Sequence, residues 1–122
     1  MSESELGGEI GLFYNTAGVM SLFGGVAEQA VDARLRSGSI HAMRTSDGVW
    51  VYPVFQFAGA DIDPRLEPAI RALRHVPGWS AGLWFVTPNP DLEGLTPLEW
   101  INDGRLDDEV AVSARRSAPE WV

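Results

Sequence analysis

Glycine and proline interrupt this chain so often that only short helices and strands fit between them. The 122 residues include 13 glycines and 8 prolines. Gly24-Gly25, Gly38 and Gly104 each end a predicted helix, and Pro77-Gly78 ends another. Glycine closes helices in the left-handed conformation and proline cannot continue a helix. The chain is therefore expected to build its core from several short elements.

Composition predicts an ordered, cytoplasmic protein with no membrane contact. Hydrophobic residues make up 45% of the chain and charged residues 21%, which disfavours disorder and allows one domain or two tightly packed small lobes. The absence of cysteine excludes disulfides, thiolate metal sites and cysteine nucleophiles. No apolar run reaches the roughly 18–20 residues of a membrane helix, and the N-terminal residues do not form a secretory signal.

The first half of the chain has the order of a small winged helix-turn-helix domain. Residues 1–11 are expected to form a flexible leader. Asn15 or Thr16 is the predicted N-cap of a first helix, which Gly24-Gly25 ends. A second helix follows and ends at Gly38, and Asp47-Gly48 is the predicted turn of a β-hairpin over 39–52. This winged helix-turn-helix lobe is expected to span 12–57.

Three arginines of this lobe are candidate DNA contacts, although the net charge of −8 argues against nucleic-acid binding by the whole surface. The second helix of such a domain can enter the major groove while the hairpin touches phosphates. Gln29 can read adenine, and Arg34, Arg36 and Arg44 can hold phosphates or read guanine. The expected apolar side of this helix carries small and aliphatic residues: Val26, Ala30, Ala33 and Leu35. About three phosphate contacts per subunit give weak binding, so dimerisation is expected to help; a vestigial or dimer-forming winged domain is the competing interpretation.

Residues 58–122 are expected to form an α-helical lobe, which makes the fold class α+β and mostly helical. Asp63 is the predicted N-cap of a helix with Pro64 at its first position. The apolar segment 79–86 favours a buried helix, with a buried strand as the competing interpretation, and Trp84 and Phe85 are expected in the core.

The last part of the chain carries the clearest helix signals. Thr96 is the predicted N-cap of a short helix, with Pro97 at its first position and Glu99 completing a capping box. A final helix over 105–117 begins with acidic residues and ends with basic ones, as the helix dipole prefers.

No set of residues demands catalysis, so we expect a protein that is not an enzyme and has no cofactor or metal. The two histidines, His41 and His75, fall on a strand and near a helix end. Asp107, Asp108 and Glu109 are consecutive, so on a helix they point around the axis instead of converging on a metal.

Aromatic and basic residues of the C-terminal half are candidate partner contacts. Trp121 follows Pro119 at the very end of the chain, where it is hard to bury, and exposed tryptophan commonly anchors interfaces. The predicted partner-binding residues are Trp100, Arg115, Arg116, Trp121 and Val122.

Two segments, "VYPVFQF" (51–57) and "GWSAGLWFVTPNPDLEGLTPLEWINDGRLDDEV" (78–110), resemble the toxin-binding region of antitoxins of the Xre/MbcA/ParS group. The resemblance rests on four features of this chain: Trp84, Thr87-Pro88-Asn89, Leu92-x-Gly94-x-Thr96-Pro97 and Gly104. The N-terminal half is similar to the shorter winged or MerR-like variant found before such regions. The resemblance implies an antitoxin whose C-terminal lobe binds and blocks a cognate RES-type toxin, an NAD-consuming enzyme, and whose N-terminal lobe binds operator DNA, as a homodimer. The alternative is a stand-alone DNA-binding regulator or a protein–protein adaptor without a toxin partner.

Overall fold

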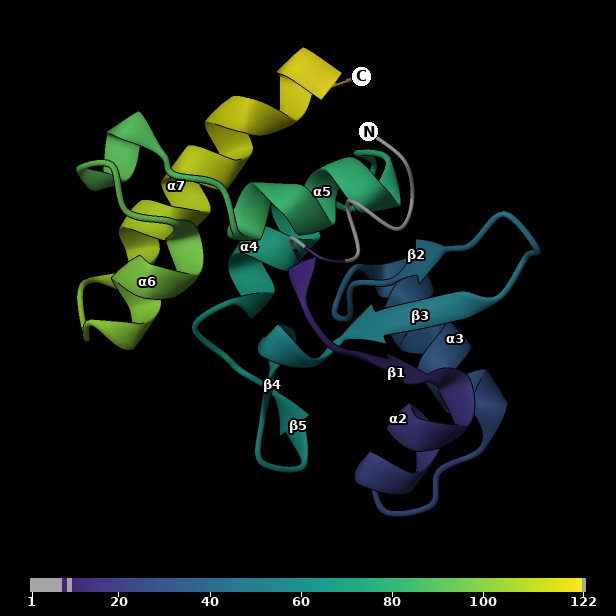
Figure 1. The fold of residues 1–122 in the computed structure, drawn as a ribbon. Helices are drawn as coiled ribbons and strands as arrows, with labels where there is room; N and C mark the ends of the chain where they lie inside the picture. Colours follow the sequence, from purple (N-terminus) through teal and green to yellow (C-terminus); the bar gives the residue numbers. More distant parts are fainter. Residues whose placement is uncertain (1–7, 9, 122) are drawn as a thin grey trace.

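A computed structural model describes residue 8 and residues 10–121, with side chains to residue 119 (Figure 1). The fold is α+β and mostly helical, which confirms the predicted class. A small sheet and the helices α2 (Thr16–Leu22) and α3 (Glu28–Ser37) lie at one end, and α6 (Pro97–Asn102) and α7 (Asp107–Ser117) lie at the other. Of the leader expected over 1–11, residues 1–7 and 9 fall outside the described part, and Ile10 is buried.

Two short helices, α2 (Thr16–Leu22) and α3 (Glu28–Ser37), follow each other across a glycine turn. The Asn15 side chain accepts a hydrogen bond from the backbone N–H of Gly18 at 2.8 Å, so the predicted N-cap is confirmed. Gly24 and Gly25 have φ angles of 90° and 86°, a region that favours glycine. The two expected helix ends, at this turn and at Gly38, are therefore confirmed.

A three-stranded antiparallel sheet packs beside these helices, in the order β1-β3-β2. Its strands are β1 (Phe13–Asn15), β2 (Met43–Arg44) and β3 (Trp50–Pro53). The turn between β2 and β3 contains Gly48 at φ 84°, whose N–H donates to the carbonyl of Thr45 at 2.9 Å. The hairpin predicted over 39–52 is therefore confirmed, although its first strand, β2, begins only at Met43. The edge strand β1 was not expected.

A turn and a second small hairpin connect the sheet to the helical part. They comprise η1 (Val54–Gln56), β4 (Phe57–Ala58) and β5 (Asp61–Ile62), and α4 (Glu67–Ala72) follows. The predicted helix start at Asp63 is wrong. The Asp63 carboxylate accepts from the Arg65 backbone N–H at 2.9 Å, as a cap does, and it also binds the Arg65 guanidinium, with Oδ2 to Nη2 at 2.8 Å. Residues 64–66 form turns, and α4 begins later than expected, at Glu67, with Pro68 in its first turn.

The remaining elements are α5 (Gly78–Phe85), η2 (Pro90–Leu92), α6 (Pro97–Asn102), α7 (Asp107–Ser117) and η3 (Ala118–Trp121). The helix predicted for 79–86 is confirmed. The capping box is confirmed as well, because Thr96 Oγ1 accepts from the Glu99 N–H at 3.0 Å and Glu99 Oε1 accepts from the Thr96 N–H at 2.8 Å. Phe85 is fully buried as expected, whereas Trp84 is half-buried and donates from Nε1 to Ser117 Oγ at 3.2 Å.

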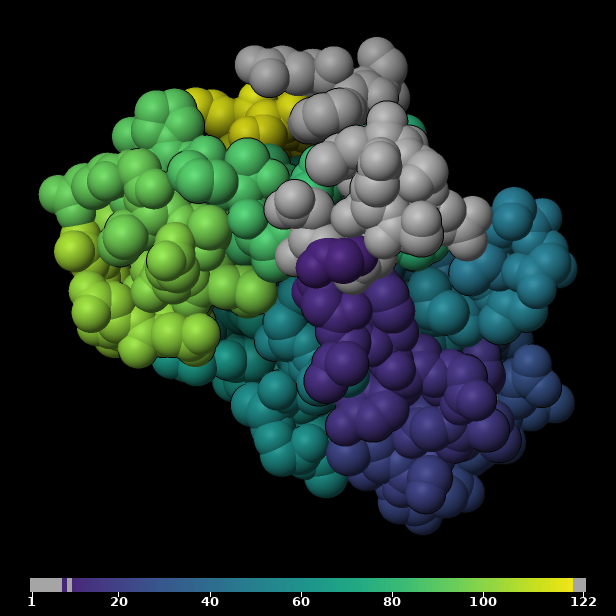
Figure 2. Space-filling model, in the orientation of Figure 1, coloured from purple at the N-terminus to yellow at the C-terminus, as the bar shows by residue number. Residues whose placement is uncertain are grey.

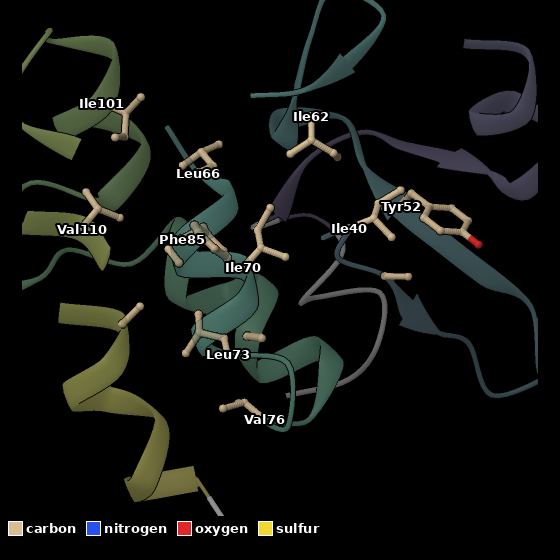
Figure 3. Packing of buried hydrophobic residues seen from close by; sticks show 14 of the residues in the cluster. Ile40, Tyr52, Ile62, Leu66, Ile70, Leu73, Val76, Phe85, Ile101 and Val110 are labelled. Atoms are coloured by element: carbon tan, nitrogen blue, oxygen red, sulfur yellow. The ribbon is translucent and has the colours of Figure 1, made fainter. Parts of the chain in front are cut away.

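One cluster of buried side chains joins the sheet to the helices (Figure 3). It extends from Tyr52 on β3 through Ile70 on α4 and Phe85 on α5 to Val110 on α7. The cluster crosses the predicted lobe boundary at residue 57, and the division of the chain there stays a prediction.

Two glycines bring α5 close to the strand segment before the hairpin turn. A Cβ at Gly78 would lie 2.9 Å from the Ala42 carbonyl oxygen, and one at Gly82 would lie 3.4 Å from both His41 Nε2 and Met43 Sδ. Their i, i+4 spacing places both on the same helix face. This face covers one side of the segment and the rest of the sheet lies beside it, so residues 40–43 are all buried. The hairpin is therefore anchored on the core.

Candidate nucleic-acid interface

The exposed face of α3 carries small and polar side chains. Val31 is fully buried, but Ala30 and Ala33 are exposed. The prediction that these two alanines belong to the apolar side of the helix is therefore wrong. The exposed residues of the helix include Gln29, Ala30, Ala33, Arg36 and Ser37. Gln29 and Arg36, two predicted DNA contacts, therefore lie on one accessible stripe with an alanine between them.

Arg34, a third predicted DNA contact, makes contacts within the protein. Its Nη1 lies 2.8 Å from Asp61 Oδ1, and its guanidinium lies 4.6 Å from the centre of the Phe23 ring. The hydrogen bond from Arg34 lowers the pKa of the Asp61 carboxyl, which keeps the pair charged. The side chain is 29% exposed, so Arg34 holds α3 to the preceding turn and to β5.

Arg44, the fourth predicted contact, lies on the β2–β3 hairpin. Its Nε donates to the carbonyl of Gly48 at 3.2 Å, and its guanidinium lies 5.3 Å from the centre of the Trp50 ring. The loop is closed by Thr45, whose N–H donates to the Val49 carbonyl at 2.9 Å and whose hydroxyl donates to the Asp47 carboxylate. These bonds give the hairpin loop a defined shape and hold Arg44 at its base.

The sheet, α2 and α3 occupy the end of the molecule opposite α6 and α7 (Figures 1 and 2). The exposed face of α3 and the hairpin loop therefore belong to the same end. Two guanidinium groups there, those of Arg36 and Arg44, pair with no carboxylate among the described residues. The exposed acids Glu28 and Asp47 offset their charge, so this end is not strongly basic.

The predicted partner contacts are not brought together. Trp100 donates from Nε1 to the Leu106 carbonyl at 2.8 Å, at the beginning of α7, and the Arg105 guanidinium lies 4.8 Å from its ring. Arg115 and Arg116 are exposed in the last turn of α7, about 15 Å further along the helix axis. The side chain of Trp121, and Val122 altogether, lie outside the described residues.

The role of Asn89 in connecting its loop to α7 was not predicted from the sequence. Its Nδ2 donates to Ser113 Oγ at 2.9 Å, the Ser113 hydroxyl donates to Asp91 Oδ2 at 3.0 Å, and Arg116 lies 3.6 Å from the same carboxylate. These contacts fix the loop 87–95 to α7. The loop and the end of α7 enclose a cleft of about 450 Å³ that Thr87, Asn89, Asp91 and Arg116 help to line. The sequence signal for this role was the position of Asn89 between Pro88 and Pro90.

The described residues contain no cluster of three or more His, Asp or Glu side chains that could hold a metal ion. His41 is buried and its Nε2 has no hydrogen-bond partner, and burial lowers its pKa from 6.5 to about 4. His41 is therefore neutral at physiological pH. No helix in the described part of the chain has both the length and the apolar character to cross a membrane.

Comparison with known proteins identifies a fold and no family. No protein-family model matches the chain, and no curated protein matches it. A solved structure described as the NMR structure of Rv2175c matches with a TM-score of 0.64, covering 91% of this chain and 82% of that chain at 20% sequence identity. This chain shares the fold of Rv2175c. At 20% identity the match shows a shared fold and nothing more, and this fold includes both the sheet and the helical part.

Proposed function

We propose that this chain binds duplex DNA as a winged helix-turn-helix protein, with α3 as the recognition helix and the β2–β3 hairpin as the wing. The observation that carries the proposal is the exposed face of α3, which follows α2 across a glycine turn and precedes a hairpin. That order and exposure match the geometry by which such proteins place a helix in the major groove and a hairpin on the backbone.

The side chains on α3 have the chemistry for reading base edges. Gln29, in the first turn of the helix, can form paired hydrogen bonds with N6 and N7 of adenine. Ala33 keeps the middle of the stripe small, which lets the helix backbone approach the base pairs. Arg36 follows at the next turn and can contact guanine or a phosphate.

The charge of the interface predicts weak binding by a single chain. Arg36 and Arg44 supply about two phosphate contacts, so the logarithm of the affinity should fall with the logarithm of salt at a slope near −2 for one chain. We propose that a homodimer acts on two half-sites about one helical turn apart, which doubles the contacts and the slope. A regulator of this kind acts in the cytoplasm, the location proposed here.

Substitution of Arg36 and Arg44 tests the proposal. A duplex is first selected from a random-sequence library by the full-length chain, and fluorescence anisotropy then measures its affinity at several salt concentrations. Arg36→Ala and Arg44→Ala should each weaken binding and, where they contact phosphates, reduce the salt slope by about one per site. Gln29→Ala should lower discrimination at an A·T pair by about 1–3 kcal/mol.

The matched control is Arg115→Ala, because Arg115 is also exposed, lies near the end of α7 and forms no ion pair with a described carboxylate. It should leave the affinity unchanged. If Arg115→Ala weakened binding as much as Arg36→Ala, or if Arg36→Ala and Arg44→Ala had no effect, α3 and the hairpin would not be the DNA-binding surface.

A second candidate function is antitoxin-like binding of a RES-type toxin by the C-terminal part. The observation that favours it is the cleft beside α7, where the Thr87-Pro88-Asn89 motif lies with Arg116. Co-expression with a RES-type toxin from the same genome should restore the growth of cells that the toxin inhibits and should yield a stable complex. Arg116→Ala should reduce both the growth rescue and the stability of the complex. Persistent toxicity and no complex would leave the stand-alone regulator as the function of this chain.

A further inference from the structure

A cleft of about 400 Å³ lies where the end of α3, the hairpin and the helices α4 and α5 meet. It is separate from the exposed face of α3 and from the cleft beside α7. Its size falls within the range of small-molecule sites, which are mostly apolar with a few converging polar groups.

The floor and walls of the cleft are apolar and aromatic. Ile70, Leu73 and Val76 belong to the buried cluster shown in Figure 3. The same three residues line this cleft. Trp50 and Trp79 line it as well, and both are half-buried. Two indole rings above an aliphatic floor suit a flat, apolar ligand body.

The tryptophans are held in place before any ligand arrives. Trp79 donates from Nε1 to the Arg44 carbonyl at 3.0 Å, and its ring meets Phe13 edge-on with centres 6.0 Å apart. Trp50 has the Arg44 guanidinium over its face. Rings that are already oriented lose little conformational entropy on binding a ligand.

The charge lining the cleft has one sign, although the chain as a whole is acidic. Arg44 and Arg74 line the cleft and no Asp or Glu does. Neither guanidinium pairs with a carboxylate among the described residues. Arg74 donates from Nη1 to the Arg71 carbonyl at 2.8 Å, and its side-chain stem would lie 3.0 Å from a Cβ at Gly38, so packing against that glycine holds it at the cleft.

We propose that this cleft binds a small aromatic carboxylate. The ring lies on the aliphatic floor between the two tryptophans, and the carboxylate is bound by the guanidinium groups of Arg44 and Arg74. Arginine presents paired donors that match the two oxygens of a carboxylate. Binding at this cleft does not depend on the proposed DNA-binding function.

Calorimetric titration of the full-length chain tests the proposal with two probes of the same shape, indole-3-acetate and its neutral amide indole-3-acetamide. The acid should bind with one site per chain, and the amide at least about tenfold more weakly, because it lacks the charge-assisted hydrogen bonds. Arg74→Gln and Arg44→Gln should each weaken binding of the acid by about tenfold. The control Arg115→Gln should leave it unchanged, since Arg115 lies outside the cleft.

Three results would overturn the proposal. The first is no binding of either probe at millimolar concentration. The second is equal affinity for the acid and the amide, which would remove the role of the arginines. The third is an unchanged affinity in both Arg74→Gln and Arg44→Gln. Because the titration contains no DNA, each of these results is distinct from a failure of DNA binding.

Discussion

Gln56→Leu is expected to lower the free energy of unfolding by about 4 kcal/mol. Gln56 is fully buried, and its side-chain amide serves as a hydrogen-bonding partner for the backbone before β2. Its Oε1 accepts from the His41 N–H at 2.8 Å, and its Nε2 donates to the carbonyls of His41 and Pro53 at 2.8 and 3.2 Å. Leucine has a similar volume but no polar atoms, so it would leave these buried backbone groups without a partner. Chemical denaturation of both proteins measures the difference.

The control for this change is Gln29→Leu, which replaces an exposed glutamine on α3 by the same residue. It should change the free energy of unfolding by less than about 0.5 kcal/mol, since surface substitutions outside special features have small effects. A loss below about 1 kcal/mol in Gln56→Leu would show that the buried amide is not what stabilises this backbone.

Lowering the pH from 7 to 4.5 is expected to destabilise the protein by about 2 kcal/mol more than it destabilises the His41→Leu variant. Burial lowers the pKa of His41 from 6.5 to about 4 in the folded chain. Between these two values the unfolded chain binds a proton that the folded chain does not, so the free energy of unfolding falls as the pH falls through this window. Denaturation curves at the two pH values measure the change within each protein, so the cost of the substitution at pH 7 cancels.

Two comparisons distinguish the acid sensitivity due to His41 from that due to other titratable groups. The pKa values of Asp61 and Asp63 are lowered from 3.8 by their hydrogen bonds to arginine, so their stabilisation is lost mainly below that pH, outside the window of His41. His75→Gln is the matched control, because His75 is exposed, and this variant should keep the acid sensitivity of the parent. Equal acid sensitivity in His41→Leu and the parent would mean that His41 titrates alike in the folded and unfolded chains.

The sequence predicts well the elements whose ends have their own local chemistry. The capping box at Thr96, the N-cap at Asn15 and the turn at Gly48 depend on residues within a few positions, so local reasoning finds them. Asp63 has the same local signal as Thr96, and its carboxylate does accept from the backbone N–H of Arg65, but the next residues form turns and α4 begins only at Glu67.

Elements that depend on distant partners were not predictable in this way. The edge strand β1 exists because it pairs with β3, with Tyr14 opposite Tyr52, nearly forty residues later. The burial of His41 depends on α5, which approaches closely because of Gly78 and Gly82. For the candidate interface, the sequence predicted Gln29 and Arg36 as contacts, but neither their shared exposed face nor the pairing of Arg34 with Asp61.

The measurement that tests DNA binding most directly maps the DNA-contacting surface by backbone amide NMR. The full-length chain, at 13.3 kDa, is titrated with the selected duplex and with an unrelated duplex of equal length. We predict that the selected duplex shifts the amide signals of 27–37 and 44–50 and leaves those of α6 and the loop 87–95 in place. Shifts confined to α6, α7 and the loop 87–95, or no shifts with either duplex, would contradict the assignment of α3 and the hairpin to DNA.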